Sequence, residues 1–172
     1  MRVKLAVAGL AAAILAVSAV TLASARTTGP SHDRGTKVFT IFTVTVQSQF
    51  LDLGPQGLSL GDQSIFADDV YDKKGGAKIG SDGVVCTVVR VTDPATGSGT
   101  AQCVATVSLP DGQLTIQGLV SFTGEELPAP FQQAITGGTG AYANARGQIT
   151  VEELSETEAN ITVELRTGKH HR

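Results

Sequence analysis

Short runs of strand-forming residues, separated by turn residues, recur from Lys37 to Arg166 and restrict the fold more than any other feature. Lys37–Ser48 is rich in Val, Ile, Phe and Thr, which favour β-strands. In Gln113–Phe122, apolar and polar side chains alternate, as in a strand with one buried face. The other predicted strands are Gln63–Tyr71, Lys78–Val91, Thr100–Leu109, a short strand near Gln133, Asn144–Leu154 and Glu158–Arg166.

The connections between these strands are short, and the chain after residue 25 has no sustained helical period. About eight short strands with hairpin-type connections indicate an antiparallel sandwich or a closed barrel. We expect an all-β fold, an eight-stranded antiparallel closed barrel, because closure removes the exposed sheet edges. A barrel of this size can hold one small ligand or be plugged by its own side chains.

A glycine-rich segment, Gln133–Glu153, contains the sequence T-G-G-T-G at positions 136–140. Glycine amides can bind phosphate where they open a helix. That interpretation fails because no Lys-Ser/Thr follows, and Gln148–Val151 alternates like a strand. We therefore predict a short strand, a tight turn at Gly137, Gly138 and Gly140, and a long strand.

The ends of the chain differ in composition from the predicted domain. Residues 1–25 combine Arg2 and Lys4, an apolar run and a small-x-small ending at Ala25, which is typical of a signal peptide cleaved after Ala25. A membrane anchor is the alternative. We expect residues 26–36 to be a disordered linker, 37–166 the β-barrel domain and 167–172 a flexible tail. The predicted localisation is secreted.

Charge and histidine positions exclude several functions. The chain has 13 Lys and Arg against 16 Asp and Glu, a net charge of −3, and loss of Arg2 and Lys4 would leave −5. An acidic chain without a basic cluster argues against nucleic acid, or a membrane after cleavage, as a partner. All three histidines, His32, His170 and His171, lie outside the predicted barrel. We therefore expect neither a Ser-His-Asp site nor a histidine-based metal site.

The two cysteines, Cys86 and Cys103, lie on either side of a predicted turn near Asp93–Gly99. Antiparallel pairing would place them nearly opposite each other on a hairpin. In an exported protein this favours a disulfide. Free thiols are the alternative, because cross-strand geometry does not always permit the bond.

Several motifs together resemble the allene oxide cyclase and dirigent barrel superfamily. They are L-G-D at 60–62 with V-Y-D at 70–72, K-I-G at 78–80 with Cys86, D-G at 111–112 with Q-G at 117–118, and A-I-T-G-G-T-G-A-Y at 134–142 with G-Q-I at 147–149. The likeness runs from about Val38 to Leu165. It implies an eight-stranded, commonly trimeric barrel with an apolar lumen, which steers cyclisation or radical coupling of apolar small molecules without a cofactor.

The resemblance also suggests site residues. The carboxylate of the cyclases aligns with Thr45 and the neighbouring amide with Gln47, and threonine cannot supply the negative charge. Cys86 matches a cysteine that lines the pocket, which places Thr45 and Gln47 in the lumen. The opposite face, Val38, Phe42, Val44 and Val46, would then meet another subunit.

Dirigent proteins use pocket aspartates and an arginine after the glycine turn, and Arg146 matches that arginine, although strand alternation would place it outside. Asp68 and Asp69 are adjacent and point to opposite faces, so at most one enters the lumen; the candidate is Asp69. The simpler alternative is one carboxylate at the rim and one in solvent. The remaining ligand-binding candidates are Phe39, Ile41, Phe66, Tyr71, Phe122 and Tyr142.

These observations lead to two functional hypotheses. The first is a secreted barrel that binds an apolar small molecule and isomerises, cyclises or sterically guides it, as a cofactor-free isomerase or a dirigent-type guide. The second is a non-catalytic carrier or structural domain whose lumen is plugged by its own side chains. A lumen filled by Phe39, Phe66 and Phe122, with no void left, would favour the second. The fold alone does not decide between them, because function resides in the site.

Overall fold

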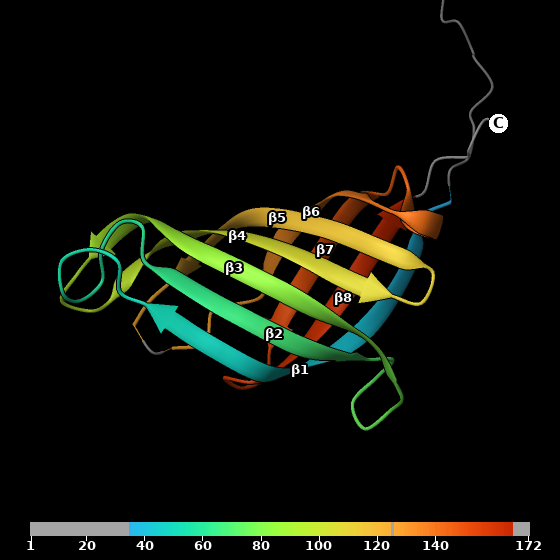
Figure 1. Cartoon of the computed structure of the whole chain (residues 1–172), viewed down its shortest axis with the longest axis horizontal. Helices are drawn as coiled ribbons and strands as arrows, with labels where there is room; N and C mark the ends of the chain where they lie inside the picture. Colours follow the sequence, from blue (N-terminus) through green and yellow to red (C-terminus); the bar gives the residue numbers. More distant parts are fainter. Residues whose placement is uncertain (1–34, 125, 167–172) are drawn as a thin grey trace, which may run out of the picture. The chain divides into compact units, whose positions relative to one another are not determined.

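The computed structural model describes residues 35–124 and 126–166, which form an antiparallel barrel closed by pairing of the first and last strands (Figure 1). The expectations for residues 1–25, for most of residues 26–36 and for residues 167–172 lie outside the described residues. The strands are β1 (Lys37–Leu51), β2 (Gln63–Tyr71), β3 (Lys78–Asp93), β4 (Ser98–Leu109), β5 (Gly112–Phe122), β6 (Phe131–Gly138), β7 (Arg146–Glu153) and β8 (Glu158–Arg166).

Each strand pairs with the next along the chain, so the β2–β3 and β4–β5 turns lie at one end of the barrel (Figure 1). The β1–β2 loop and the β3–β4 turn lie at the other end. Asp62 fixes the β1–β2 loop. Its buried carboxylate accepts hydrogen bonds from the backbone N–H of Leu53 at 3.0 Å and of Ser59 at 2.7 Å.

The inward face of the sheet carries the apolar core. Directly opposed residues of antiparallel strands share a face, so the pairs Val84–Ala105 and Ala105–Ile116 mark the inward set. The buried core cluster comprises Ile41, Val70, Ala105, Val107, Leu114, Ile116, Ile135, Ala145, Ile149, Val163 and Leu165.

The glycine segment forms the strand and turn expected from the sequence, with one added element. Strand β6 ends at Gly138, and a 3₁₀ turn, η1 (Gly140–Tyr142), precedes β7. Gly140 has φ +58°, and a Cβ there would collide with the carbonyl oxygen of Asp111. The turn therefore requires glycine at this position. Tyr142 packs against the core at this end of the barrel.

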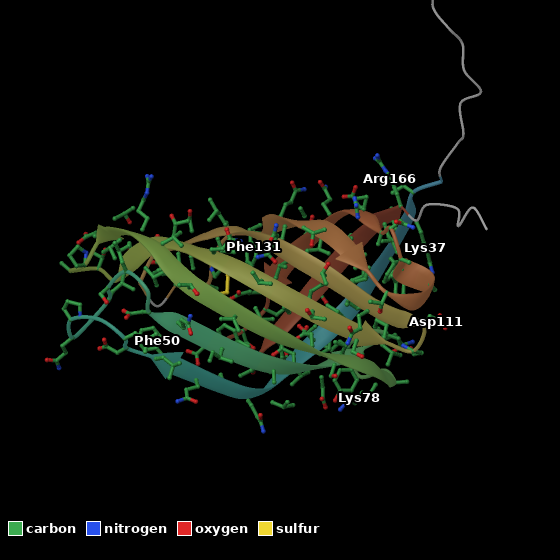
Figure 2. All side chains as sticks on the ribbon, turned by 45° about the horizontal axis from the view of Figure 1, so that its top comes forward. Lys37, Phe50, Lys78, Asp111, Phe131 and Arg166 are labelled. Carbon is green, nitrogen blue, oxygen red and sulfur yellow. A yellow bond between two sulfur atoms is a disulfide. The ribbon has the colours of Figure 1, made fainter. Side chains whose placement is uncertain are left out.

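The predicted disulfide is present. Cys86 on β3 and Cys103 on β4 are direct cross-strand partners and are bonded, with 4.0 Å between their Cα atoms (Figure 2). Both belong to the inward set, because Cys86 lies two residues from Val84 on β3 and Cys103 two residues from Ala105 on β4.

Candidate functional site

Two carboxyl groups face each other on the inward side of the barrel. Asp68 on β2 is the direct cross-strand partner of Asp82 on β3. Asp82 in turn pairs with Val107 on β4, which is 3% exposed and belongs to the core cluster. Both carboxyl groups therefore lie among core side chains and not on the outer surface.

The surroundings of this carboxyl pair are mostly apolar. Along β2, Asp68 lies between Val70, which is fully buried, and Phe66, which is half-buried. Phe66 pairs with Val84 of β3, also on the inward face. On β1 the residue opposite Asp68 is Thr45. The two carboxyl groups thus have little polar protein surface around them.

This burial changes the protonation of the pair. It raises the pKa of Asp82 to about 7, and repulsion by the Asp68 carboxylate and a hydrogen bond between the two side chains add to the effect. One oxygen of each carboxyl group, Oδ1, is buried without a hydrogen-bond partner in the part of the chain that the structure describes. Near neutral pH the two groups can share one proton.

No basic side chain compensates the pair. Among residues 35–124 and 126–166, the ion pairs join Lys74 to Glu158 and Lys78 to Asp69, each at 2.6 Å, and none reaches Asp68 or Asp82. A buried carboxylate without a cationic partner is energetically costly and marks a candidate functional site.

Asp69, the candidate chosen from the sequence, lies on the outer face. It pairs with Val44 across β1 and forms its ion pair with Lys78. Of the two adjacent aspartates it is Asp68 that points inward, because Thr45 and Asp68 share the face of Thr43 and Val70. Asp82 was not among the site residues predicted from the sequence. The available signal was alternation, because Asp82 lies four residues before Cys86 in the same strand and so shares its face.

Thr45 and Gln47 do not share a face, which corrects the expectation from the sequence. The β1–β2 register shifts between these residues, so Thr45 lies opposite Asp68 and Gln47 lies opposite Ala67. A bulge inserts one extra residue and reverses the alternation that follows it. Thr45 therefore joins the carboxyl pair, whereas Gln47 is exposed on the outer side.

The other candidates divide between the two faces. Ile41 is in the core with Phe39 packed against it, and Phe66 and Phe122 are half-buried on the inward face. Tyr71 is on the outer side, where its ring lies 6.5 Å from that of Phe42. Cys86 is consumed in the disulfide and offers no thiol.

Arg146 is exposed and bonds to backbone. Its Nη1 donates hydrogen bonds to the carbonyl oxygens of Thr136, at 3.0 Å, and Ala145, at 2.7 Å. It alternates with Gly147 and buried Ile149 and so lies on the outer face. The structure does not bring it together with the carboxyl pair.

A separate hollow of about 230 Å³ lies beside the start of β7 and the end of β8, lined by Thr36, Gly147, Gln148, Glu164 and Arg166. Gln148 and Glu164 are hydrogen-bonded to each other at 3.1 Å. This hollow is open and holds no residue of the carboxyl pair. We place the candidate site at Asp68 and Asp82 because, within residues 35–124 and 126–166, these two carboxyl groups hold the buried side-chain oxygens that lack a hydrogen-bond partner.

The described residues contain no group of three or more His, Cys, Asp and Glu side chains arranged to hold a metal ion. No helix among them has the length and apolar character needed to cross a membrane.

Comparisons with known proteins identify the fold and the family. The structure is similar to a pyocyanin demethylase, with 32% identity and a TM-score of 0.63 over 75% of this chain and 99% of that one. A Diels Alderase, AbmU from Streptomyces koyangensis, has 16% identity and a TM-score of 0.60 over 80% of this chain and 70% of that one. The pterocarpan synthase dirigent protein PsPTS1 has 15% identity and a TM-score of 0.60 over 79% of this chain and 97% of that one.

The chain's sequence matches no curated protein. Residues 42–165 match the family described as "Allene oxide cyclase barrel like domain". This match covers β2 to β8 and most of β1, and so includes every strand of the barrel. The chain therefore belongs to the allene oxide cyclase-like barrel family.

Proposed function

We infer that the barrel binds an apolar small molecule beside Asp68 and Asp82 and isomerises or cyclises it by proton transfer. The observation that carries this proposal is the inward-facing carboxyl pair, with one unpartnered buried oxygen on each group. Such groups are available to a ligand. Core side chains such as Val70 and Val107 would exclude water around it.

The proton shared by the pair suits general acid–base chemistry. A catalytic acid or base works best with a pKa near the working pH, and the pKa of Asp82 is raised to about 7. One carboxyl group donates its proton to the substrate while the ionised partner accepts a proton from another atom of it. The pair again holds one proton, the substrate keeps its formula, and no redox equivalent is consumed.

The comparisons support small-molecule chemistry on this barrel without assigning the reaction. The pyocyanin demethylase shares 32% identity, whereas the Diels Alderase and the dirigent protein fall to 16% and 15% and support the fold alone. We take from them that barrels of this shape serve enzymes and guiding proteins. The reaction itself rests on the carboxyl pair.

The proposal keeps the expectations of secretion and of a homo-oligomer, with a trimer favoured. On the outer face of β1, Val38 and Val46 are 61% and 56% exposed. Exposed apolar side chains on one strand can form part of a subunit contact. Multi-angle light scattering of the mature protein, together with V38E and V46E variants, would test this assembly.

The second hypothesis, a carrier or structural domain, also has support. Leu114, Ile116, Ile135, Ile149 and Val163 are all buried inside the barrel, and Phe39 packs against them. These side chains fill part of the interior. A carrier would retain a ligand without converting it, and a plugged domain would retain none.

Adjacent valines of β3 provide a matched test of lumen binding. Val84 faces inward opposite Ala105, whereas Val85 faces outward, pairs with Val104 and is 39% exposed. We expect V84F to weaken binding of the neutral fluorophore N-phenyl-1-naphthylamine at least about tenfold by filling the lumen, and V85F to leave it unchanged. Circular dichroism would check that both variants fold. A folded V84F variant that binds like the wild type would contradict lumen binding.

Catalysis is tested on the molecule that the protein itself retains. Native mass spectrometry of protein purified from its secretion medium would identify that ligand. We expect D82N to retain it and to convert it about 100-fold or more slowly than the wild type, because one proton-transfer group is lost. An unchanged rate would overturn the acid–base role. Retention without conversion by the wild type would establish a carrier.

A further inference from the structure

Resting on the proposed function, we propose that the small molecule is an organic cation, an apolar body with one positive charge held against Asp68 and Asp82. Two carboxyl groups face each other with no ion pair to either, in the part of the chain that the structure describes. Each also has a buried oxygen without a partner.

The chain's own neighbouring cations are already engaged elsewhere. Lys78 pairs with Asp69 on the outer face. Lys74 pairs with Glu158, and its ammonium lies 5.4 Å from the centre of the Phe42 ring. Neither lysine is available to the carboxyl pair. Since no ion pair within the described residues reaches Asp68 or Asp82, a bound molecule would supply a positive charge there.

The strands next to the pair leave its charge unopposed. The facing residue on β1 is Thr45 and on β4 is Val107, neither of which titrates. Along β2 and β3 the nearest inward residues are Val70, Phe66 and Val84. A further inward-facing carboxyl group is Glu153 of β7, whose partner Ala159 on β8 pairs with Thr43 of β1. Burial raises the pKa of Glu153 as well, so it adds no positive charge to the pair. Thr43, buried opposite Val70, and Thr45 add hydroxyl groups to a wall that is otherwise mostly apolar beside the pair.

These surroundings select among ligand charges. An anion would be repelled by the ionised carboxylate. A neutral hydrogen-bond donor would satisfy the free oxygens but leave the negative charge buried. A cation compensates that charge where the local dielectric constant is low. The ring of Phe66, on the same face, can also contact a positively charged aromatic system.

A bound cation changes the first step of the proposed proton transfer, because the pair then has no proton to donate and acts first as a base. The cation favours the form in which both carboxyl groups are ionised, so the shared proton leaves to solvent. A carbon–hydrogen bond beside a positively charged nitrogen is acidified. One carboxylate can take that proton and return it to another atom of the ligand, which leaves the ligand's formula unchanged.

Three probes of the same size separate the charge classes. They are N-methylquinolinium, a permanent cation; 1-methylnaphthalene, its neutral counterpart; and 1-naphthoate, an anion. At pH 8 we expect calorimetry to show the cation binding at least about tenfold more tightly than the neutral probe, and the anion more weakly than both. Cation affinity should fall about tenfold from pH 8 to pH 6, because the bound state excludes the shared proton.

Proton release provides an independent readout. The charge of N-methylquinolinium does not change with pH, so any proton released on binding comes from the protein. At pH 7 we expect about half a proton per cation, measured from binding heats in two buffers of different ionisation enthalpy. The neutral probe should release none. Cation binding without proton release would argue against contact with the pair.

Variants separate this inference from the proposed function. We expect D82N to remove the pH dependence of cation binding. The double variant D68N/D82N should abolish the preference for the cation over the neutral probe. The control D111N, which removes one charge from the exposed β4–β5 turn, should change neither the pH dependence nor the preference. If the wild type binds the neutral probe as tightly as the cation, and V84F blocks both, lumen binding stands and the cation inference is overturned. If no probe is blocked by V84F, both proposals fall.

Discussion

Asp82 is the direct cross-strand partner of Asp68, and burial beside this second carboxyl group raises the pKa of Asp82 to about 7. In the unfolded chain the same group titrates near its ordinary value of 3.8. Between these two pH values the folded protein binds the additional proton. Its contribution to stability is therefore fully present below pH 3.8 and is lost as the pH rises through 7.

The first prediction concerns stability against pH. Relative to D82N, the wild type should gain about 2 kcal/mol in unfolding free energy when the pH is lowered from 8 to 5. The D82N variant serves as the reference because it retains every other titrating group. Urea unfolding at several pH values would measure the difference. Parallel stability curves for the two proteins would contradict the raised pKa.

A second prediction separates the two adjacent aspartates. Asp69 is on the outer face and pairs with Lys78, whose side chain is 53% exposed. Exposed ion pairs contribute about 0 to 1 kcal/mol. We therefore expect D69N to lower the unfolding free energy by no more than this and to leave probe binding unchanged, whereas D68N weakens cation binding. Equal effects of D69N and D68N on binding would indicate that the register is wrong.

The third prediction concerns the disulfide. The bond between Cys86 and Cys103 closes a loop with a sequence separation of 17 residues. Its reduction should lower the unfolding free energy by about 2 to 4 kcal/mol. The C86S/C103S variant should show a similar loss and no further response to reductant. Intact-mass measurement of the untreated protein should find no free thiol; two free thiols would refute the bond.

Glycine replacements test the turn between β6 and β7. Gly140 adopts φ +58° and faces the carbonyl oxygen of Asp111, so G140V should destabilise the fold by at least about 2 kcal/mol. Gly138 lacks a positive φ but abuts the carbonyl oxygens of Gln113 and Tyr142, so G138V should also destabilise. The control is G83A, where a Cβ enters open space. An unchanged melting temperature for G140V would refute the requirement for glycine.

The strand limits could be predicted well because they depend on local composition. The limits of Gln63–Tyr71 and Glu158–Arg166 are those expected from the sequence, and β1 runs three residues beyond the predicted end at Ser48. Strand-forming residues and turn residues occupy separate segments of this chain. The number and spacing of those segments left a sandwich or a barrel open, and the expectation of closure, which the structure confirms, came from the removal of exposed sheet edges.

The site could be predicted only in part, because it depends on contacts between strands. The bulge between Thr45 and Gln47 has no glycine or proline to mark it, and it moves Gln47 to the outer face. A second register shift lies between Val70 and Tyr71 in the β2–β3 pairing, where Val70 pairs with Gly80 and Tyr71 with Lys78. The partnership of Asp68 with Asp82 requires the register of two strands, which composition alone does not fix.

The Cys86–Cys103 bond also determines where Asp82 points. A slip of β3 by one residue against β4 would turn every side chain of β3 to the opposite face and carry Asp82 into solvent. The bond joins the two strands four residues from Asp82 and permits only the alignment in which Cys86 lies opposite Cys103. The covalent link thereby keeps the Asp82 carboxyl group on the inward face of the barrel, beside Asp68.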